Sequence, residues 1–499
     1  MAGSDQIMSL YVNAAKGAPG RYFIGPFGRR VSFASQQQRA LNTVWALKES
    51  GLIREGQDIA VIGAGLSGVM AATALANLGC SVWIFESRTR PLERQSRTNH
   101  RWIHPSINFW PLQELEATTH FPYYDWFADQ CSQVVRSLEK DWERLSGRIT
   151  DIFTSTSVQS VTDRDGKQIV SFRKYDGAPQ EMDFDSVVFS VGFGDEKTVT
   201  GSDGTSYWDE DDLFSICRSS KPIVIAGSGD GGIIDALRSV HSQFRWGRLP
   251  VELAEKLHSS GVFHKMKLAE EEASQETIEL SANAVLAKHY PKIFQALDGN
   301  SRALLDGSIY KPTVPVRLVG TSETPYSLRS APIHRLMIAH AIHSGAVVYE
   351  KGELVDGPAV KHDDGTLADI KDSYCVARLG PVPPLHTFLD QQEVGQLKSR
   401  QEALSDLVGT TPYSNDYWKG FDDYPQRDEA GLDFARRRLS LAAHYVTDTF
   451  GLRLGLGRDE EGAFYAISKP MGQSSIRIPE HIFGIRAVAH DEELFDALA

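Results

Sequence analysis

The stretch DIAVIGAGLSGVMAATALANLGCSVWIFE, residues 58–86, contains each part of a strand–helix–strand unit that binds dinucleotides. An apolar strand leads directly into Gly63, Gly65 and Gly68, which form the pattern G-x-G-x-x-G. The first glycine permits a tight turn, the second lets a pyrophosphate approach the backbone, and the third lets helix and strand pack closely. The helix that follows directs unpaired N–H groups at the phosphates. We therefore predict a pyrophosphate site at this loop.

The end of the unit indicates which nucleotide binds. Gly79 ends the helix, and Glu86 follows the second strand, where a carboxylate can accept hydrogen bonds from ribose hydroxyls. An acid in this place favours FAD or NAD over a nucleotide with a 2′-phosphate. The residues predicted to bind this first nucleotide are Gly63, Ala64, Gly65, Ser67, Gly68, Glu86, Ser87, Arg88, Arg94 and Gly192.

A second glycine-rich loop lies in KPIVIAGSGDGGIIDALR, residues 221–238, again between an apolar strand and a predicted helix. The unit can be completed by the strand in VPVRLVGTSETPYSLR, residues 314–329, only if about 241–312 is a helical insertion. The loop is either a second nucleotide site or a tight turn without a ligand. Its candidate binding residues are Gly227, Ser228, Gly229, Asp230 and Gly232.

The order of these parts resembles that of flavoproteins with two dinucleotide-binding domains, such as flavin-dependent monooxygenases and pyridine-nucleotide reductases. In that class a strand ending in A-T-G follows each domain's nucleotide loop. DSVVFSVGFG (185–194) and DSYCVARLGP (372–381) stand in these places without A-T-G. The resemblance covers about residues 58–390. It implies an α/β fold with an FAD-binding Rossmann-type parallel-sheet domain and a second nucleotide-binding domain carrying the helical insertion, and it implies FAD and NAD(P)H as cofactors.

The two ends of the chain lack some of the features expected of this class or of regular structure. Residues 1–31 contain several glycines and prolines and are predicted to be irregular. Near the C-terminus, this class has a Gly-Asp pair that contacts the ribityl chain, whereas Gly484 is followed here by Ile485.

The expected segments are an N-terminal arm and helix (1–55), the FAD-binding domain (56–220), the NAD(P)-binding-like domain (221–390) and a C-terminal segment that returns to the FAD domain or caps the site (391–499).

The segment TNHRWIHPSINFWP, residues 98–111, is dense in His, Arg and Trp. In the resembled class the chain passes the pyrophosphate and the flavin ring at this point. Arg101 can neutralise phosphate or hold a substrate carboxylate, and His104 can transfer a proton near neutral pH. The alternative is aromatic packing around a hydrogen-bonded histidine. Arg101 and His104 are therefore the candidate catalytic residues.

Other polar residues have simpler interpretations. The run Glu270–Glu272 is interpreted as a solvated helix face. Arg317 and Arg329 flank the second strand of the second unit, where each either meets a 2′-phosphate or points to solvent. No metal site is expected, because no acid or cysteine stands at ligand spacing from the three histidines of one predicted helix, His334, His340 and His343.

Composition excludes several classes of protein. The 499 residues include 65 acidic and 52 basic side chains, a net charge of −13, which argues against a nucleic-acid-binding surface. The four cysteines make no C-x-x-C pair, which disfavours disulfide reductases and structural zinc. No signal-peptide pattern or run of 18 apolar residues occurs, so we expect a cytoplasmic protein that does not contact membranes. The expected partner is a small-molecule substrate, and the oligomeric state stays open.

Taken with the resemblance, these patterns predict an FAD-dependent oxidoreductase. The leading prediction is an NAD(P)H-dependent monooxygenase that acts on a small polar substrate. One alternative is an oxidase or dehydrogenase that uses FAD alone, with the second loop serving as a structural turn. The other is a nucleotide-binding sensor or regulatory protein with little turnover.

Overall fold

The computed structural model describes residues 4–119, 121–241, 244, 247–407, 409–413 and 417–418, and the antiparallel strands β20 (Arg453–Leu454), β21 (Tyr465–Ile467) and β22 (Ser475–Arg477). The chain divides into two compact units, one of Met1–Leu115 with Phe121–Trp418 and one of Glu116–His120 with Lys419–Ala499. The fold and site below belong to the first unit. Gly484 and Ile485 lie outside the described residues.

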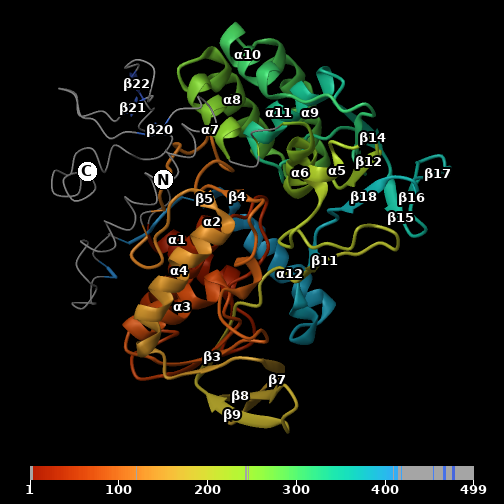
Figure 1. Ribbon diagram of the computed structural model, residues 1–499. Helices are drawn as coiled ribbons and strands as arrows, with labels where there is room; N and C mark the ends of the chain where they lie inside the picture. The colour runs from red at the N-terminus through yellow and green to blue at the C-terminus, as the bar shows by residue number, and fades with distance from the viewer. Residues whose placement is uncertain are drawn as a thin grey trace. The chain divides into compact units, whose positions relative to one another are not determined.

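A five-stranded parallel sheet forms the centre of the first domain, in the order β1-β10-β2-β3-β6. Its inner strands are almost wholly buried, as expected where both faces of a parallel sheet are covered. Helix α3 (Leu66–Asn77) packs on β2 and β3, and α2 (Phe33–Glu49) packs on α3 (Figure 1). The strands are β1 (Arg21–Phe23), β2 (Asp58–Ile62), β3 (Ser81–Phe85), β6 (Asp151–Phe153) and β10 (Ser186–Phe189).

The other face of this sheet is covered by a three-stranded antiparallel sheet, β7 (Thr156–Arg164), β8 (Lys167–Lys174) and β9 (Gln180–Phe184). Ile62 and Phe85 of the parallel sheet share one buried cluster with Phe172 and Phe184. Leu397 of α12 (Gln391–Glu402) joins the same cluster, so the chain returns to the first domain after the second.

The second domain repeats this plan. Its parallel sheet has the order β14-β13-β12-β18, with β12 (Ile223–Ala226), β13 (Val316–Gly320), β14 (Val347–Lys351) and β18 (Tyr374–Ala377). Helices α6 (Asp230–Val240) and α11 (Pro332–His343) cover one face. The antiparallel strands β15 (Glu353–Val355), β16 (Ala359–Lys361) and β17 (Leu367–Asp369) cover the other (Figure 1). The α/β fold class predicted from the sequence is confirmed.

Four helices lie between α6 and β13 along the chain: α7 (Arg248–His258), α8 (Gly261–Gln275), α9 (Glu279–Gln295) and α10 (Gly299–Ser308). They share one hydrophobic cluster with α6 and α11. Because β13 pairs directly with β12, the strand–helix–strand unit is completed across this insertion.

Short elements connect these layers. In the first domain they are η1 (Glu93–Gln95), β4 (Trp102–Ile103), β5 (Asp129–Gln130), α4 (Cys131–Leu145) and η2 (Ser146–Arg148). Between and after the domains they are β11 (Asp195–Glu196), α5 (Leu213–Ile216), β19 (Pro381–Val382), η4 (Pro384–Thr387) and η5 (Ala403–Leu407).

The prediction of an irregular segment over residues 1–31 is wrong in two places. Ser4–Ala15 form α1, whose Tyr11 and Ala14 are buried. Arg21–Phe23 form β1, which pairs with residues 187–189 at the edge of the parallel sheet. A three-residue edge strand carries little local pattern, because its partner comes from a distant part of the chain.

The interpretation of Glu270–Glu272 as a solvated face is wrong for Glu270, whose side chain is fully buried. It pairs with Arg30 at 2.5 Å and with Arg335, and it accepts a hydrogen bond from the Tyr290 hydroxyl at 2.9 Å. We call these four residues the Glu270 cluster. They join the N-terminal segment to the inserted helices and to α11.

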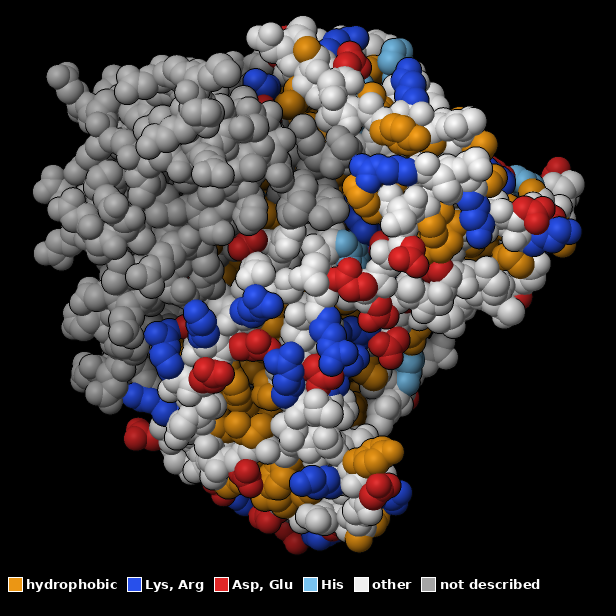
Figure 2. Space-filling model, viewed as in Figure 1, with side chains coloured by type: hydrophobic (Ala, Val, Ile, Leu, Met, Phe, Trp, Pro, Cys, Tyr) orange, Lys and Arg blue, Asp and Glu red, His pale blue; other side chains and the backbone are white. Residues whose placement is uncertain are grey.

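The surface fits the charge balance of the sequence. On the face shown in Figure 2, basic side chains are interleaved with acidic ones. None of the described helices combines the length and the apolar character needed to span a bilayer.

Candidate functional site

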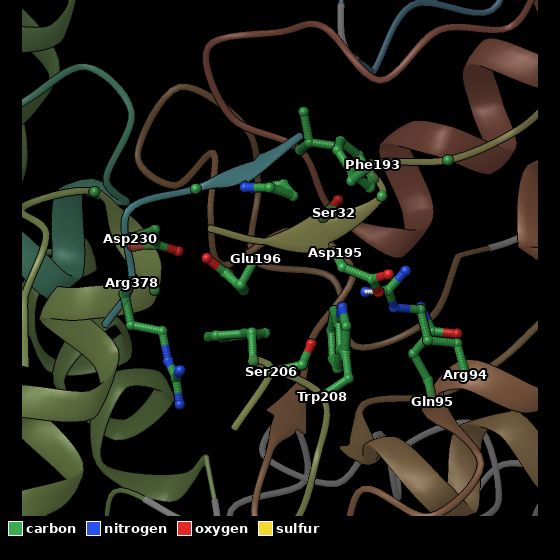
Figure 3. Close-up of a pocket in the computed structure, with 18 of the residues that line it drawn as sticks. Ser32, Arg94, Gln95, Phe193, Asp195, Glu196, Ser206, Trp208, Asp230 and Arg378 are labelled. Atoms are coloured by element: carbon green, nitrogen blue, oxygen red, sulfur yellow. Dashed lines mark hydrogen bonds and ion pairs between the residues drawn. The ribbon is translucent and has the colours of Figure 1, made fainter. Parts of the chain in front are cut away.

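A cavity of about 1520 Å³ lies at the carboxyl ends of the two parallel sheets (Figure 3). It exceeds the roughly 300–1,000 Å³ of an ordinary small-molecule pocket. Most residues predicted from the sequence line it: Gly63, Ala64, Gly65, Ser67, Glu86, Ser87, Arg88, Arg94, Arg101, His104, Gly192, Gly227, Ser228, Gly229 and Asp230. Gly68 and Gly232 do not line it and instead pack beneath the two loops.

The first loop has the geometry that a pyrophosphate site requires. Gly63 has a φ of +100°, and a Cβ there would lie 2.3 Å from the Ser190 carbonyl oxygen. A Cβ at Gly68 would lie 2.0 Å from the Gly63 carbonyl oxygen, so only glycine fits at either place. At Gly65, by contrast, a Cβ would meet no protein atom within 4 Å. The loop thus leaves open space at the amino end of α3, where a phosphate binds.

Glu86 is fixed at the end of β3. One carboxylate oxygen accepts a hydrogen bond from the Ala64 N–H at 2.7 Å, and the other accepts one from the Arg88 N–H at 2.8 Å. The oxygen bonded to Ala64 keeps a lone pair for a ribose hydroxyl, while the oxygen bonded to Arg88 also accepts a longer hydrogen bond from the Ser87 hydroxyl at 3.3 Å. Loop and acid together fit the pyrophosphate and a ribose of FAD.

The second loop reproduces the first. The Gly227 N–H donates to the Val319 carbonyl at 2.7 Å, as the Gly63 N–H donates to Phe85 at 2.8 Å. A Cβ at Gly227 would lie 2.0 Å from the Arg378 carbonyl oxygen, and one at Gly232 would lie 1.8 Å from the Gly227 carbonyl oxygen. At Gly229 a Cβ would meet nothing within 4 Å. The second loop therefore also leaves space for a phosphate at the amino end of its helix.

The two loops differ where the first has its acid. Ile62 pairs with Phe85 just before Glu86, and Ala226 pairs with Val319 just before Gly320. Gly320 therefore stands in the place of Glu86 and itself supplies no carboxylate for a ribose 2′-hydroxyl. The two arginines considered for a 2′-phosphate are already paired, Arg317 with Glu350 at 2.7 Å and Arg329 with Glu279 at 2.7 Å.

Asp230 connects the second loop to α11. Its Oδ1 accepts hydrogen bonds from the Ala331 N–H at 2.9 Å and from His334 Nδ1 at 2.8 Å. A carboxylate offers only acceptors, so it cannot bind a phosphate oxygen. The structure thus gives Asp230 a positioning role in the loop, and it places His334 in this link.

Arg101 lines the cavity but its guanidinium is committed elsewhere. It donates to Asp235 at 2.5 and 3.2 Å and to the Tyr207 carbonyl at 2.9 Å. Arg238 and Arg378 also pair with Asp235, each at 2.7 Å. Burial opposes the charge of Asp235, but these three guanidiniums outweigh it and hold its pKa well below the ordinary value. The structure thus places the Arg101 guanidinium in an ion cluster, and its binding of phosphate or substrate stays a prediction.

His104 is buried beside the cavity. Its Nδ1 accepts from the N–H groups of Ser106 and Ile107, both at 3.3 Å. Burial lowers its pKa to about 3, so the ring is neutral at physiological pH. This geometry favours the alternative of a hydrogen-bonded packing histidine over that of a proton donor.

Among the cavity residues that the sequence did not predict are two charged ones, Glu196 on β11 and Arg378 directly after β18. Each follows the return strand of a domain, where a charged residue after an apolar run is the only local signal. Among the described residues, no group of three or more His, Cys, Asp or Glu side chains is placed to hold a metal ion.

Comparison with known families identifies the first domain. The family model for FAD dependent oxidoreductases matches residues 58–186. The chain therefore carries an FAD-dependent oxidoreductase domain. The matched residues include the first glycine loop and Glu86. No curated protein matches the chain significantly.

The solved structures that are similar to this chain include the following three enzymes. Bacillithiol disulfide reductase from Bacillus cereus is 12% identical, with 68% of this chain and 84% of that chain covered and a TM-score of 0.41. Thioredoxin reductase from T. acidophilum is 12% identical, with 72% and 100% covered and a TM-score of 0.36. S-allyl-L-cysteine S-oxygenase from Allium sativum is 13% identical, with 67% and 65% covered and a TM-score of 0.33.

Proposed function

We propose that this FAD-dependent oxidoreductase takes its electrons from NAD(P)H and acts as a monooxygenase on a small polar substrate. The observation that carries the proposal is the duplicate loop. The turn at Gly227, the packing at Gly232 and the open space at Gly229 repeat the first loop, and both loops line one cavity. A nucleotide bound at each loop would place the flavin ring and the nicotinamide ring in the same cavity.

The chain's own residues bind, orient and exclude water. The loop from Gly63 to Ser67 and the amino end of α3 would hold the FAD pyrophosphate, and Glu86 would hold a ribose. Gly227 to Gly229 and the amino end of α6 would hold the second pyrophosphate. FAD, when bound, supplies the redox chemistry of the site.

The cysteines favour oxygen over a disulfide as the electron acceptor. All four are described by the structure, all are buried, and none lines the cavity. Burial raises the pKa of each thiol, which disfavours the reactive thiolate. The positions concerned are Cys80, Cys131, Cys217 and Cys375.

Anaerobic mixing of the purified yellow protein with NADPH or NADH tests the proposal. Rapid bleaching of the flavin absorbance by either nucleotide supports it. Because Gly320 supplies no carboxylate to repel a 2′-phosphate, we expect NADPH to bleach the flavin at least as fast as NADH. The missing acid also favours one alternative, an oxidase or dehydrogenase that uses FAD alone. Bleaching only by an organic substrate would establish that alternative and refute NAD(P)H dependence.

The variant Gly229→Val is expected to keep its FAD and lose reduction by NAD(P)H. A side chain at this place meets no protein atom within 4 Å, so the fold tolerates it while the second phosphate position is filled. Stopped-flow bleaching should slow by at least about 100-fold if nucleotide binding weakens by roughly 3 kcal/mol. Equal loss of FAD from this variant would place the loop in the flavin site instead.

A further inference from the structure

The two segments that link the domains lie side by side at the cavity. β11 leaves the first domain, β19 returns to it, and they pair antiparallel with Glu196 opposite Pro381. Both strands contribute residues to the cavity wall. Glu196 and Arg378 are charged residues that line the cavity near this crossing, as are Asp195 and Lys197.

Glu196 carries an oxygen that is not used within the protein. Its carboxylate accepts a hydrogen bond from the Gly380 N–H, while Oε2 is buried and has no hydrogen-bond partner among the described residues. Burial raises its pKa, partly offset by the positive charge of Arg378. Figure 3 shows the side chain extending toward the side of the pocket where Asp230 and Arg378 lie.

Arg378 carries the complementary donor. Its guanidinium is held by Asp235, which accepts from Nε at 2.7 Å, and by the Thr205 carbonyl, which accepts from Nη1 at 2.9 Å. Nη2 is buried without a hydrogen-bond partner in the described part of the chain. The side chain is thus fixed in place, with the two N–H donors of Nη2 unsatisfied among the described residues.

Buried polar atoms in folded proteins are nearly always hydrogen-bonded, so each unsatisfied atom calls for an explanation. Glu196 and Arg378 both line the cavity and pair an unsatisfied acceptor with an unsatisfied donor at one crossing, whereas the other unsatisfied atoms of the described lining residues belong to Gln36, His100 and Trp102. A group that offers an N–H donor and a carbonyl acceptor side by side would satisfy both. A primary carboxamide has this arrangement on a single carbon atom.

The position of the pair agrees with the expected path of a pyridine nucleotide. In a Rossmann-type domain the pyrophosphate crosses the glycine loop, and the ribose next to the adenine lies beyond the second strand, here β13. The nicotinamide half then extends to the opposite side of the loop, over β18. Arg378 directly follows β18, and its carbonyl oxygen lies against Gly227.

We propose that Glu196 and Arg378 bind the carboxamide of the nicotinamide ring. The amide nitrogen donates to Glu196 Oε2, and the amide oxygen accepts from Arg378 Nη2. The pair thereby fixes the orientation of the ring at the crossing between the domains. This assignment rests on the proposed use of NAD(P)H and names the residues that orient it.

We call the pair of Glu196 and Arg378 the carboxamide clamp. Calorimetric measurement of the binding of oxidised nucleotides to the FAD-loaded protein tests this clamp without turnover. The probes are NADP⁺ and NAD⁺, each compared with its 3-acetylpyridine analogue, in which a methyl group replaces the amide nitrogen. The wild-type protein is expected to bind the analogue roughly 10- to 100-fold more weakly, the scale of a lost hydrogen bond to a charged group. In Glu196→Gln this preference should fall to near unity, because the new side-chain amide can keep its bond to Gly380 while presenting a donor to the site.

The control is Glu181→Gln on β9, an exposed acid that does not line the cavity and is expected to keep the full preference. The clamp is overturned if the wild-type protein binds each nucleotide and its 3-acetylpyridine analogue equally well, or if Glu196→Gln keeps the wild-type preference for the nucleotide. Either result leaves NAD(P)H dependence in place. Failure of the wild-type protein to bind any of the four nucleotides overturns the proposed function and the clamp together. The wild-type comparison needs no variant, so it holds even if Glu196→Gln folds poorly.

Discussion

The variant Gly65→Val is expected to fold and to purify without its flavin. A Cβ at this position meets no protein atom within 4 Å, so the chain itself has room for a side chain. That room is the space at the amino end of α3 that a pyrophosphate needs. FAD affinity should fall by about 100-fold or more, corresponding to roughly 3 kcal/mol of steric conflict.

The ratio of flavin to protein absorbance after purification, followed by titration with FAD, measures this loss. Gly147→Val is a suitable control, since its Cβ also meets nothing within 4 Å and Gly147 does not line the cavity. Gly68→Val should behave differently, because its Cβ would lie 2.0 Å from the Gly63 carbonyl oxygen and would disturb the fold itself. Stoichiometric flavin in Gly65→Val would refute the assignment of this loop.

The variant Glu270→Ala is expected to destabilise the fold strongly. It removes the carboxylate between Arg30 and Arg335 and leaves two buried guanidiniums without their partner. Removing one member of a buried ion pair costs about 3–5 kcal/mol. Thermal and denaturant unfolding should both report a large loss in the free energy of unfolding.

Glu271→Ala is the matched control, because the neighbouring side chain is exposed and its removal should change stability by less than about 0.5 kcal/mol. Burial opposes the charge of Glu270, but Arg335 and Arg30 outweigh burial and lower its pKa. Its contribution is therefore complete above the unfolded value of about 4.3 and is lost as the pH falls through the lower folded value. The gap in stability between wild type and Glu270→Ala should narrow in acid. Equal stability of both variants at neutral pH would contradict the role of the cluster.

Local pattern predicted the parts of the fold that depend on neighbouring residues. The strand over 58–62, the turn at Gly63, the helix after it and the acid at Glu86 all lie within one continuous stretch, and the structure has each of them. The second loop was equally visible. Its completing strand, β13, was identified beyond the insertion from its apolar character.

The remaining features depend on contacts between distant residues. Arg101 and Asp235 are 134 positions apart, so nothing near Arg101 indicates that a buried carboxylate engages it. Arg30 and Glu270 are 240 positions apart, and a run of three glutamates normally marks a solvated face. Glu196 and Arg378 meet the same cavity only because two return strands end at one crossing. Side chains of this kind follow from tertiary structure, which local periodicity does not encode.

Because β11 pairs antiparallel with β19, the second domain is an insertion within the chain of the first domain. The whole second domain enters and leaves the first through two adjacent strands, with Asp195 opposite Val382. Its two ends therefore lie together, the arrangement under which one domain can be inserted into a loop of another. Beyond β19 the chain returns to the first domain, since α12 packs against it. Because the two ends of the inserted part are adjacent, a short turn in its place would reconnect the chain of the first domain.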